Sequence, residues 1–233
     1  STSAWEEAIV KTLKGKDYDD TLIWKTIEGI DVRPYYRAED MKYAPSLPAQ
    51  KPFDRGVRTN SNKWEIRADV GGSDNKSANK AALTALMNGA NNIAFQNSVA
   101  NPEGLDELLN DVMIELINVQ FAADHHILDL HQWFRDLIRA RGLSSAQIRG
   151  AYAYDPIGNL LKTGNWYDDK GGDFSSASDL LDALEDFSPL FRGIEVNAEL
   201  YHNAGASIAQ ELGCALAHGN EYLAQLTGAG HTV

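Results

Sequence analysis

Residues that could transfer protons gather where predicted strands end. Tyr201 and His202 are adjacent at the end of segment 194–200, whose alternating apolar residues predict a β-strand. An imidazole there could act as a general acid or base, because enzymes built from βα units keep their active sites at the C-terminal ends of strands. The alternative for His202 is a loop imidazole bonded to a neighbouring backbone group. Asp155 and Glu199 also lie at or near strand ends. They could form a catalytic carboxylate pair, or they could simply be solvated residues at the rim of the sheet.

One short segment has the composition of a metal site. In residues 124–131 (DHHILDLH), His125 and Asp129 are four positions apart, a spacing that two ligands on a helix can have. His131, however, falls on an apolar stripe of the same predicted helix. That stripe contains Ile127, Leu130, Phe134 and Ile138. We therefore interpret His131 as a packed core residue and expect no metal site in this segment.

A repeated series of strands and helices would position these side chains. The predicted strands are 63–70, 92–97, 117–122, 148–154 and 194–200, and the predicted helices are 76–87, 102–114, 125–140, 176–187 and 208–226. Each strand is followed by a helix, which is the pattern of a parallel sheet. Residues 155–175 are predicted to form one long loop. A βα barrel and an open doubly wound sheet both fit, but no G-x-G-x-x-G follows the first strand, which disfavours a dinucleotide-binding fold.

The first 62 residues are predicted to form an arm ahead of a domain at 63–233. The arm is expected to contain a helix over 3–14, a β-hairpin over 21–36 that turns at Glu28-Gly29, and an extended connector over 45–62. The domain at 63–233 would hold about four βα units, which is half of an eight-unit barrel, and the chain is too short for eight.

Composition argues against several kinds of partner. A formal net charge of −12 and a pI of about 4.9 disfavour binding to nucleic acid or to an anionic membrane surface. No apolar run approaches the roughly 20 residues of a membrane-spanning helix, and the opening residues lack the features of a signal peptide. The single cysteine, Cys214, permits no disulfide within the chain, which fits a reducing compartment. We therefore expect a cytoplasmic protein.

Stretches from both ends of the chain resemble one known family. Residues 22–36 (LIWKTIEGIDVRPYY) are similar to the N-terminal arm of methylmalonyl-CoA mutase, and residues 64–67 (WEIR) resemble the W-x-I-R strand before its barrel. Residues 204–223 are similar to a family helix with the pattern A-G-A…E-L…A-L-A-x-G-x-E-Y. The resemblance implies that the domain at 63–233 is the N-terminal half of a (β/α)8 TIM-barrel-type α/β fold, and it implies an isomerase of propionate metabolism. Its barrel would bind acyl-CoA along the barrel axis, and a separate C-terminal domain would bind adenosylcobalamin through D-x-H-x-x-G.

The cobalamin motif of the family is incomplete in this chain. Residues 129–134 (DLHQWF) carry Phe134 where the motif has glycine, and a predicted helix replaces its strand-to-loop context. The resemblance therefore implies adenosylcobalamin as a cofactor of the family's holoenzyme. We expect none to be bound to this chain.

Three working positions of the family's catalytic subunit are substituted. Its tyrosine in I-R-Q-Y-A-G corresponds to Asp69, and its glutamine in G-T-I-Q-N-D corresponds to Ala153. Its histidine in G-Y-H-M-Q-E-A-G-A corresponds to Leu200 in an ungapped alignment, whereas a two-residue gap would align Tyr201-His202 with the family's Y-H pair. The ungapped alignment predicts no catalytic residue. The chain then resembles the family's non-catalytic small subunit, or an N-terminal portion of it.

The alignments leave three functions open. The first is a structural partner that forms a heterodimer with the catalytic large subunit of the mutase. The second is an active acyl-CoA mutase or isomerase that uses Tyr201 and His202, and the third is a stand-alone acyl-CoA-binding module. Half a barrel would leave strand edges open near Asn92 and at 194–200, and the arm adds apolar side chains such as Trp24. In isolation we therefore expect a homodimer or larger species, with the arm of one chain on the body of another.

Overall fold

The computed structural model describes residues 2–41, 46–53, 55–58 and 63–232. The chain divides into two compact units, which are described separately. The first contains Ser1–Lys63 together with Ser207–Ala209, and the second contains Trp64–Ala206 and Gln210–Val233. The predicted connector at 45–62 lies partly outside the described residues.

The first unit contains short helices and a small hairpin. Its elements are α1 (Thr2–Thr12), α2 (Tyr18–Leu22), β1 (Trp24–Lys25), β2 (Asp31–Val32) and the 3₁₀ helix η1 (Ala38–Asp40). The predicted helix is confirmed as α1, and the predicted hairpin is confirmed in a shorter form with Trp24 opposite Val32. Its predicted start at residue 21 is wrong, because Asp17 accepts a hydrogen bond from the Asp20 N–H and starts α2 instead.

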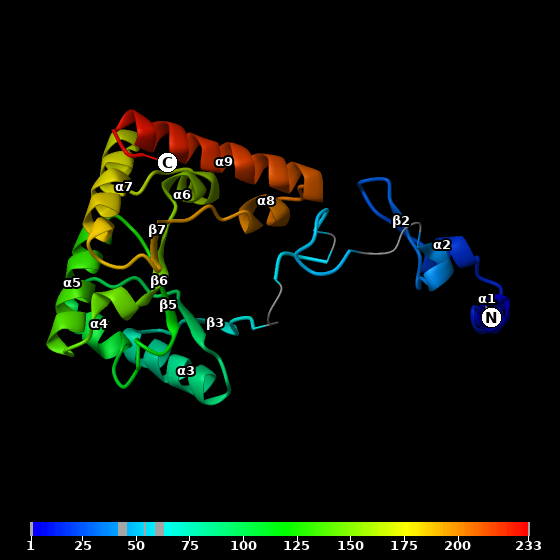
Figure 1. Cartoon of the computed structure of the whole chain (residues 1–233), viewed down its shortest axis with the longest axis horizontal. Helices are drawn as coiled ribbons and strands as arrows, with labels where there is room; N and C mark the ends of the chain where they lie inside the picture. Colours follow the sequence, from blue (N-terminus) through cyan, green and yellow to red (C-terminus); the bar gives the residue numbers. More distant parts are fainter. Residues whose placement is uncertain (1, 42–45, 54, 59–62, 233) are drawn as a thin grey trace. The chain divides into compact units, whose positions relative to one another are not determined.

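The second unit is built on a five-stranded parallel sheet. The strands are β3 (Arg67–Val70), β4 (Asn92–Phe95), β5 (Asn118–Ala122), β6 (Arg149–Tyr154) and β7 (Phe191–Ile194). They lie side by side in chain order, from β3 to β7 (Figure 1). In a doubly wound sheet the strand order reverses at a switch point. The strands here keep their chain order without a reversal, which is the order found in a barrel. The sheet begins at β3, so the predicted open edge near Asn92 is wrong: β4 pairs with β3 along its whole length.

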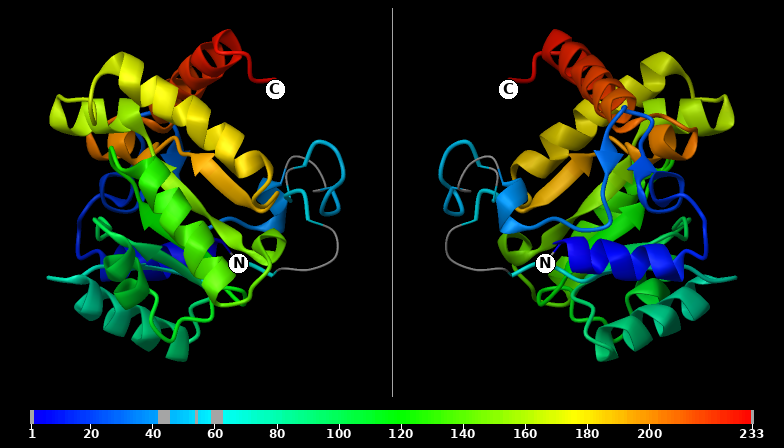
Figure 2. Two further views of the ribbon diagram at one scale, coloured as in Figure 1. Left: turned by 90° about the vertical axis from the view of Figure 1, so that its left-hand side faces the viewer. Right: turned by 90° about the vertical axis from the view of Figure 1, so that its right-hand side faces the viewer.

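Four helices form a layer against one face of this sheet. They are α3 (Asn75–Met87), α4 (Pro102–Leu108), α5 (Ile127–Ala140) and α7 (Lys170–Glu185). They contact one another in that order, and α3 and α7 pack on the outer strands β3 and β7. In the left view of Figure 2, α5 and α7 lie across the sheet on the viewer's side. The core between the layers includes Phe95, Phe121, Phe134, Tyr152 and Leu180.

The remaining elements of the second unit adjoin the strand ends. They are α6 (Pro156–Thr163), α8 (Glu199–Asn203), α9 (Ile208–Gly228) and the 3₁₀ helix η2 (Ser145–Gln147). The predicted long loop at 155–175 is therefore partly helical. Asp155 starts α6 by accepting the Gly158 N–H at 2.9 Å, and Pro156 follows at the first helical position, where proline is favoured.

The predicted strand at 194–200 is largely wrong. β7 ends at Ile194, and Glu199 already belongs to α8. The Asn197 N–H donates to the Asp155 carboxylate at 3.1 Å, and the Asn197 side chain accepts the Glu199 N–H at 3.1 Å. These two bonds take the chain away from the sheet and into a helical turn. The alternating apolar residues thus belong to a half-buried loop rather than to a strand.

Three predicted helices were close to the observed ones, and two were misplaced at one end. The helices predicted at 76–87, 125–140 and 208–226 are confirmed as α3, α5 and α9 within two residues at each end. The helix predicted at 176–187 begins six residues earlier, at Lys170 of α7. The helix predicted at 102–114 ends at Leu108, and Asp111 beyond it has a φ of 58°, which an α-helix does not allow. No helix in the described part of the chain is both long enough and apolar enough to cross a membrane.

Candidate functional site

A polar pocket lies where the parallel strands end. Its volume is about 440 Å³, and its lining includes residues that follow four successive strands. These are Ser98 after β4, Asp124 after β5, Asp155 after β6 and Glu195 after β7. Barrel enzymes bind their substrates at this end of the strands. The pocket is therefore the candidate functional site.

Asp155 is the centre of a buried hydrogen-bond network at this pocket. Its Oδ1 accepts the Gly158 N–H at 2.9 Å and the Tyr222 hydroxyl at 2.6 Å, and its Oδ2 accepts the Asn197 N–H at 3.1 Å. His218 Nε2 lies 2.9 Å from the same Oδ1. Burial and the adjacent Asp155 carboxylate both raise the pKa of Tyr222, so its hydroxyl stays protonated and donates. A carboxylate with this many partners serves to join β6, α6 and α9.

Tyr201 extends the network towards the protein surface. Its hydroxyl lies 3.0 Å from His218 Nδ1, so Tyr201, His218 and Asp155 form a continuous chain of polar groups. The contact between His218 Nε2 and Asp155 is close, but it does not have the geometry of a hydrogen bond. Burial raises the pKa of Tyr201. Sequence reasoning missed His218 and Tyr222 as site residues, although two polar residues four apart in line with Leu226, on the buried stripe of α9, were a usable signal.

The structure separates the two predicted proton-transfer residues. His202 is turned to solvent, with 65% of its side chain exposed, and its Nδ1 lies 3.1 Å from Glu211 Oε2. Tyr201 faces His218 instead, and neither residue is among those that line the pocket. Glu199, the predicted carboxylate partner of Asp155, accepts a hydrogen bond from Asn203.

The substituted family positions can now be located. Ala153 and Leu200 both line the pocket, so two of the three positions present apolar side chains to it. Asp69 lies on the outer strand β3, forms an ion pair with Arg67 at 2.8 Å and accepts a hydrogen bond from Gln96 at 3.4 Å. None of these three side chains can donate a hydrogen bond to a thioester carbonyl.

Acidic side chains dominate the pocket. Asp124, Asp155 and Glu195 line it with a single cation, Lys162. Burial raises the pKa of Glu195; the Arg67 charge lowers it, and the Asp155 and Asp69 charges add smaller raising contributions. A carboxylate-bearing acyl group would meet net negative charge here.

His131 is a core residue, as the sequence predicts. It is 3% exposed, its Nδ1 lies 3.1 Å from the Tyr152 hydroxyl, and its Nε2 lies 3.3 Å from the Ala183 carbonyl oxygen. Burial lowers the pKa of His131 to about 4. Among the described residues, no three His, Cys, Asp or Glu side chains are grouped as metal ligands would be.

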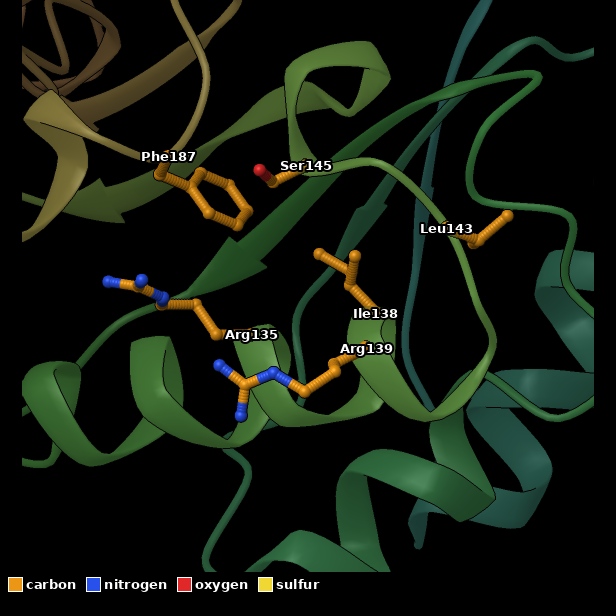
Figure 3. A pocket seen from close by; sticks show the side chains of 6 residues that line it. All are labelled: Arg135, Ile138, Arg139, Leu143, Ser145 and Phe187. Carbon is orange, nitrogen blue, oxygen red and sulfur yellow. The ribbon is translucent and has the colours of Figure 1, made fainter.

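Two further hollows have a different character. A cavity of about 180 Å³ beside α5 is lined by Arg135, Arg139 and Phe187 (Figure 3). Arg139 also pairs with Asp136 at 3.1 Å. A larger groove of about 1050 Å³ runs between β7 and α9. Its lining is mainly apolar. It includes Leu184, Ile194, Leu216, Tyr222 and Leu223.

The sheet order and the pocket define the class of protein. This is a βα domain of the TIM-barrel type, with its candidate site at the C-terminal ends of the strands. The family model for methylmalonyl-CoA mutase matches residues 25–107 and 97–233. The chain therefore belongs to the methylmalonyl-CoA mutase family, which confirms the resemblance found in the sequence.

Curated relatives include both small subunits and whole enzymes. The chain is 34% identical to the methylmalonyl-CoA mutase small subunit of Porphyromonas gingivalis, over 99% of this chain and 38% of the relative. It is 31% identical to the small subunit of Streptomyces virginiae, over 93% of this chain and 35% of the relative. It is 23% identical to the mitochondrial methylmalonyl-CoA mutase of Homo sapiens, over 98% of this chain and 34% of the relative. The chain thus spans little more than a third of the length of these relatives.

Proposed function

We propose that this chain is an N-terminal portion of the small subunit of an adenosylcobalamin-dependent methylmalonyl-CoA mutase. Its role would be structural: it would pair with the catalytic large subunit that interconverts methylmalonyl-CoA and succinyl-CoA. The observation that carries the proposal is the presence of Ala153 and Leu200 in the wall of the strand-end pocket. An alanine and a leucine cannot polarise a thioester carbonyl, so the chemistry would belong to the partner.

The contacts made by the other polar side chains near the pocket support a structural role. The Asp155 carboxylate is held by backbone and side-chain donors from three elements, which leaves it poorly placed to act on a substrate. His202 is paired with Glu211 outside the pocket. The excess of carboxylates in the pocket would also repel a carboxylated acyl thioester.

The segment that comes closest to the family's cobalamin motif, residues 129–134, does not fit it. In that segment His131 would have to be the cobalt ligand. Both of its ring nitrogens already contact buried groups, the Tyr152 hydroxyl and the Ala183 carbonyl oxygen. Phe134, which replaces the motif's glycine, is also fully buried. The cofactor would therefore be held elsewhere in the holoenzyme.

A cytoplasmic location is part of the proposal. Cys214 is exposed and free on α9. A reducing compartment such as the cytoplasm keeps surface thiols of this kind reduced.

A turnover assay separates this proposal from its two alternatives. The chain would be assayed for succinyl-CoA formation from methylmalonyl-CoA and adenosylcobalamin, with and without a catalytic subunit of the family. We expect no turnover from the chain alone. Turnover that His202→Ala abolishes would favour an isomerase that uses Tyr201 and His202. Tight acyl-CoA binding without turnover and without a partner would favour a stand-alone binding module.

A further inference from the structure

The segment after α9 brings an imidazole against a serine hydroxyl of α7. Ser178 Oγ lies 2.7 Å from His231 Nε2, and His231 Nδ1 lies 3.8 Å from Asp182 Oδ1. Ser178 and Asp182 are four residues apart on α7 and so share one face. Gly230, with a φ of 106°, reverses the chain after α9, and the His231 N–H donates to the Leu226 carbonyl at 3.0 Å. The three side chains are thus brought together by two elements distant in sequence.

Ser178 also lines an open cleft. The cleft has a volume of about 540 Å³ and lies between α7 and the C-terminal end of α9. Figure 1 shows these two helices close to the C-terminus of the chain. Phe174 and Ala229 supply apolar lining, and Ser175 and Gln225 supply polar groups. A space of this size admits a small ligand beside the hydroxyl. It is separate from the pocket at the strand ends, because the two share no lining residue.

The order of groups is that of an activated nucleophile. Asp182 favours the tautomer of His231 with its hydrogen on Nδ1, and Nε2 is then free to accept the proton of the Ser178 hydroxyl. The side chain of His231 is 21% exposed, whereas that of Asp182 is 70% exposed. His231 is therefore held in place largely by packing and by its backbone, and Asp182 acts on it as a positioning residue across a partly solvated gap.

We propose that Ser178 is an acylation site that takes an acyl group from a small activated ester or thioester. The Ser178 oxygen forms a bond to the carbonyl carbon of the donor while its proton passes to His231 Nε2. The bond between the carbonyl carbon and the leaving oxygen or sulfur then breaks, and the leaving group takes that proton. The products are an ester on Ser178 and a free alcohol or thiol, with no change of oxidation state. The proposal does not depend on the subunit role argued above.

Deacylation is expected to be slow. The backbone N–H groups of Ala229 and Gly230 beside the cleft already donate to the Gln225 and Thr227 carbonyls at 3.0 Å and 3.1 Å. They are not available to stabilise the tetrahedral oxyanion that forms in both acylation and deacylation, and one such donor contributes about 10²–10³-fold in rate. An activated donor still acylates, because its leaving group departs more readily than the serine oxygen does in deacylation. The acyl-serine should therefore accumulate as a stoichiometric product rather than turn over rapidly.

The test is acetylation of the full chain by p-nitrophenyl acetate. We expect a burst of p-nitrophenolate close to one equivalent, and an acetyl ester on the peptide that contains Ser178. Neutral hydroxylamine should remove this ester but leave the amides formed on surface lysines. Ser178→Ala should lose the burst. Ser175→Ala, which alters the same helix and the same cleft, should keep it, and circular dichroism would check that both variants are folded.

Substitutions of His231 and of Asp182 should affect the acylation rate differently. His231→Gln should slow acylation by about 10²-fold, the lower end of what a general base contributes. Asp182→Asn should lower the acylation rate, with little change in how that rate depends on ester concentration. Asp182→Glu should restore most of the acylation rate. A hydroxylamine-labile burst that persists in folded Ser178→Ala, or no burst above buffer in the unaltered chain, would overturn the proposal.

Discussion

Single buried groups make this chain sensitive to pH. His131 is the clearest case, because its ring lies between Tyr152 and the Ala183 carbonyl oxygen with only 3% of the residue exposed. The sequence revealed its burial through the apolar stripe of α5. The hydrogen-bond partners could not be predicted, since Tyr152 and Ala183 come from other elements and meet His131 only once the layers pack.

We predict that acid weakens the fold through His131. Its pKa is about 4 in the folded chain, below the ordinary value of about 6.5 that it regains on unfolding. Between these values the unfolded chain binds the extra proton, so stability is full above about pH 6.5 and falls as the pH drops towards 4. The loss should reach about 3 kcal/mol at most.

Urea unfolding at pH 7 and pH 4.5 would measure this loss. His131→Gln should reduce the difference between the two pH values, whereas His202→Gln, at an exposed position, should leave it unchanged. An equal pH dependence in the unaltered chain and in His131→Gln would contradict this account of the core.

At the scale of elements, helices were easier to predict than the loops beyond the strands. Amphipathic stripes located α3, α5 and α9 to within a few residues. The strand predicted at 194–200 failed because Asp155, some forty residues away, draws the Asn197 N–H out of the sheet. The candidate site was missed in part for the same reason. His218 and Tyr222 acquire their roles only when α9 docks on Asp155, a contact that no local pattern encodes.

The docking of α9 should depend on one hydroxyl. Tyr222→Phe removes the 2.6 Å bond to Asp155 and the acceptor for the Ile157 N–H, and it leaves buried polar groups with fewer partners. Such a loss costs roughly 1–3 kcal/mol. Tyr201→Phe, whose hydroxyl contacts only His218 in the described structure, should cost less. Urea denaturation of the two variants would show their order, and an equal or reversed order would argue against Asp155 as the centre of the network.

At the scale of the whole molecule, the chain leaves much apolar surface uncovered. The β7–α9 groove is lined by leucines, with Leu216 65% exposed, and in the other unit Trp24 is 67% exposed. Uncovered apolar surface of this kind favours association. The βα repeat predicted the five strands, and the family resemblance predicted the barrel class. The groove at the last strand could not be predicted, because it depends on how α9 packs beside β7.

We predict that the isolated chain self-associates at micromolar concentration. Trp24→Ala and Leu216→Asp should each shift sedimentation velocity profiles towards the monomer, because Leu216 lines the apolar β7–α9 groove and Trp24 is an exposed aromatic residue of the arm. Met87→Ala, at an exposed position on α3 outside the groove and the arm, serves as the control and should have little effect. A monomeric profile for the unaltered chain, unchanged by these substitutions, would show that the exposed surface is not an association site in isolation.

The central claim is that this chain serves a mutase as a structural partner. The most direct measurement is co-purification of the tagged chain with an untagged catalytic subunit of the family, with stoichiometry read by sedimentation equilibrium. The account predicts a one-to-one complex that survives dilution to micromolar concentration. Recovery of the tagged chain alone, at concentrations where both proteins are folded, would contradict it.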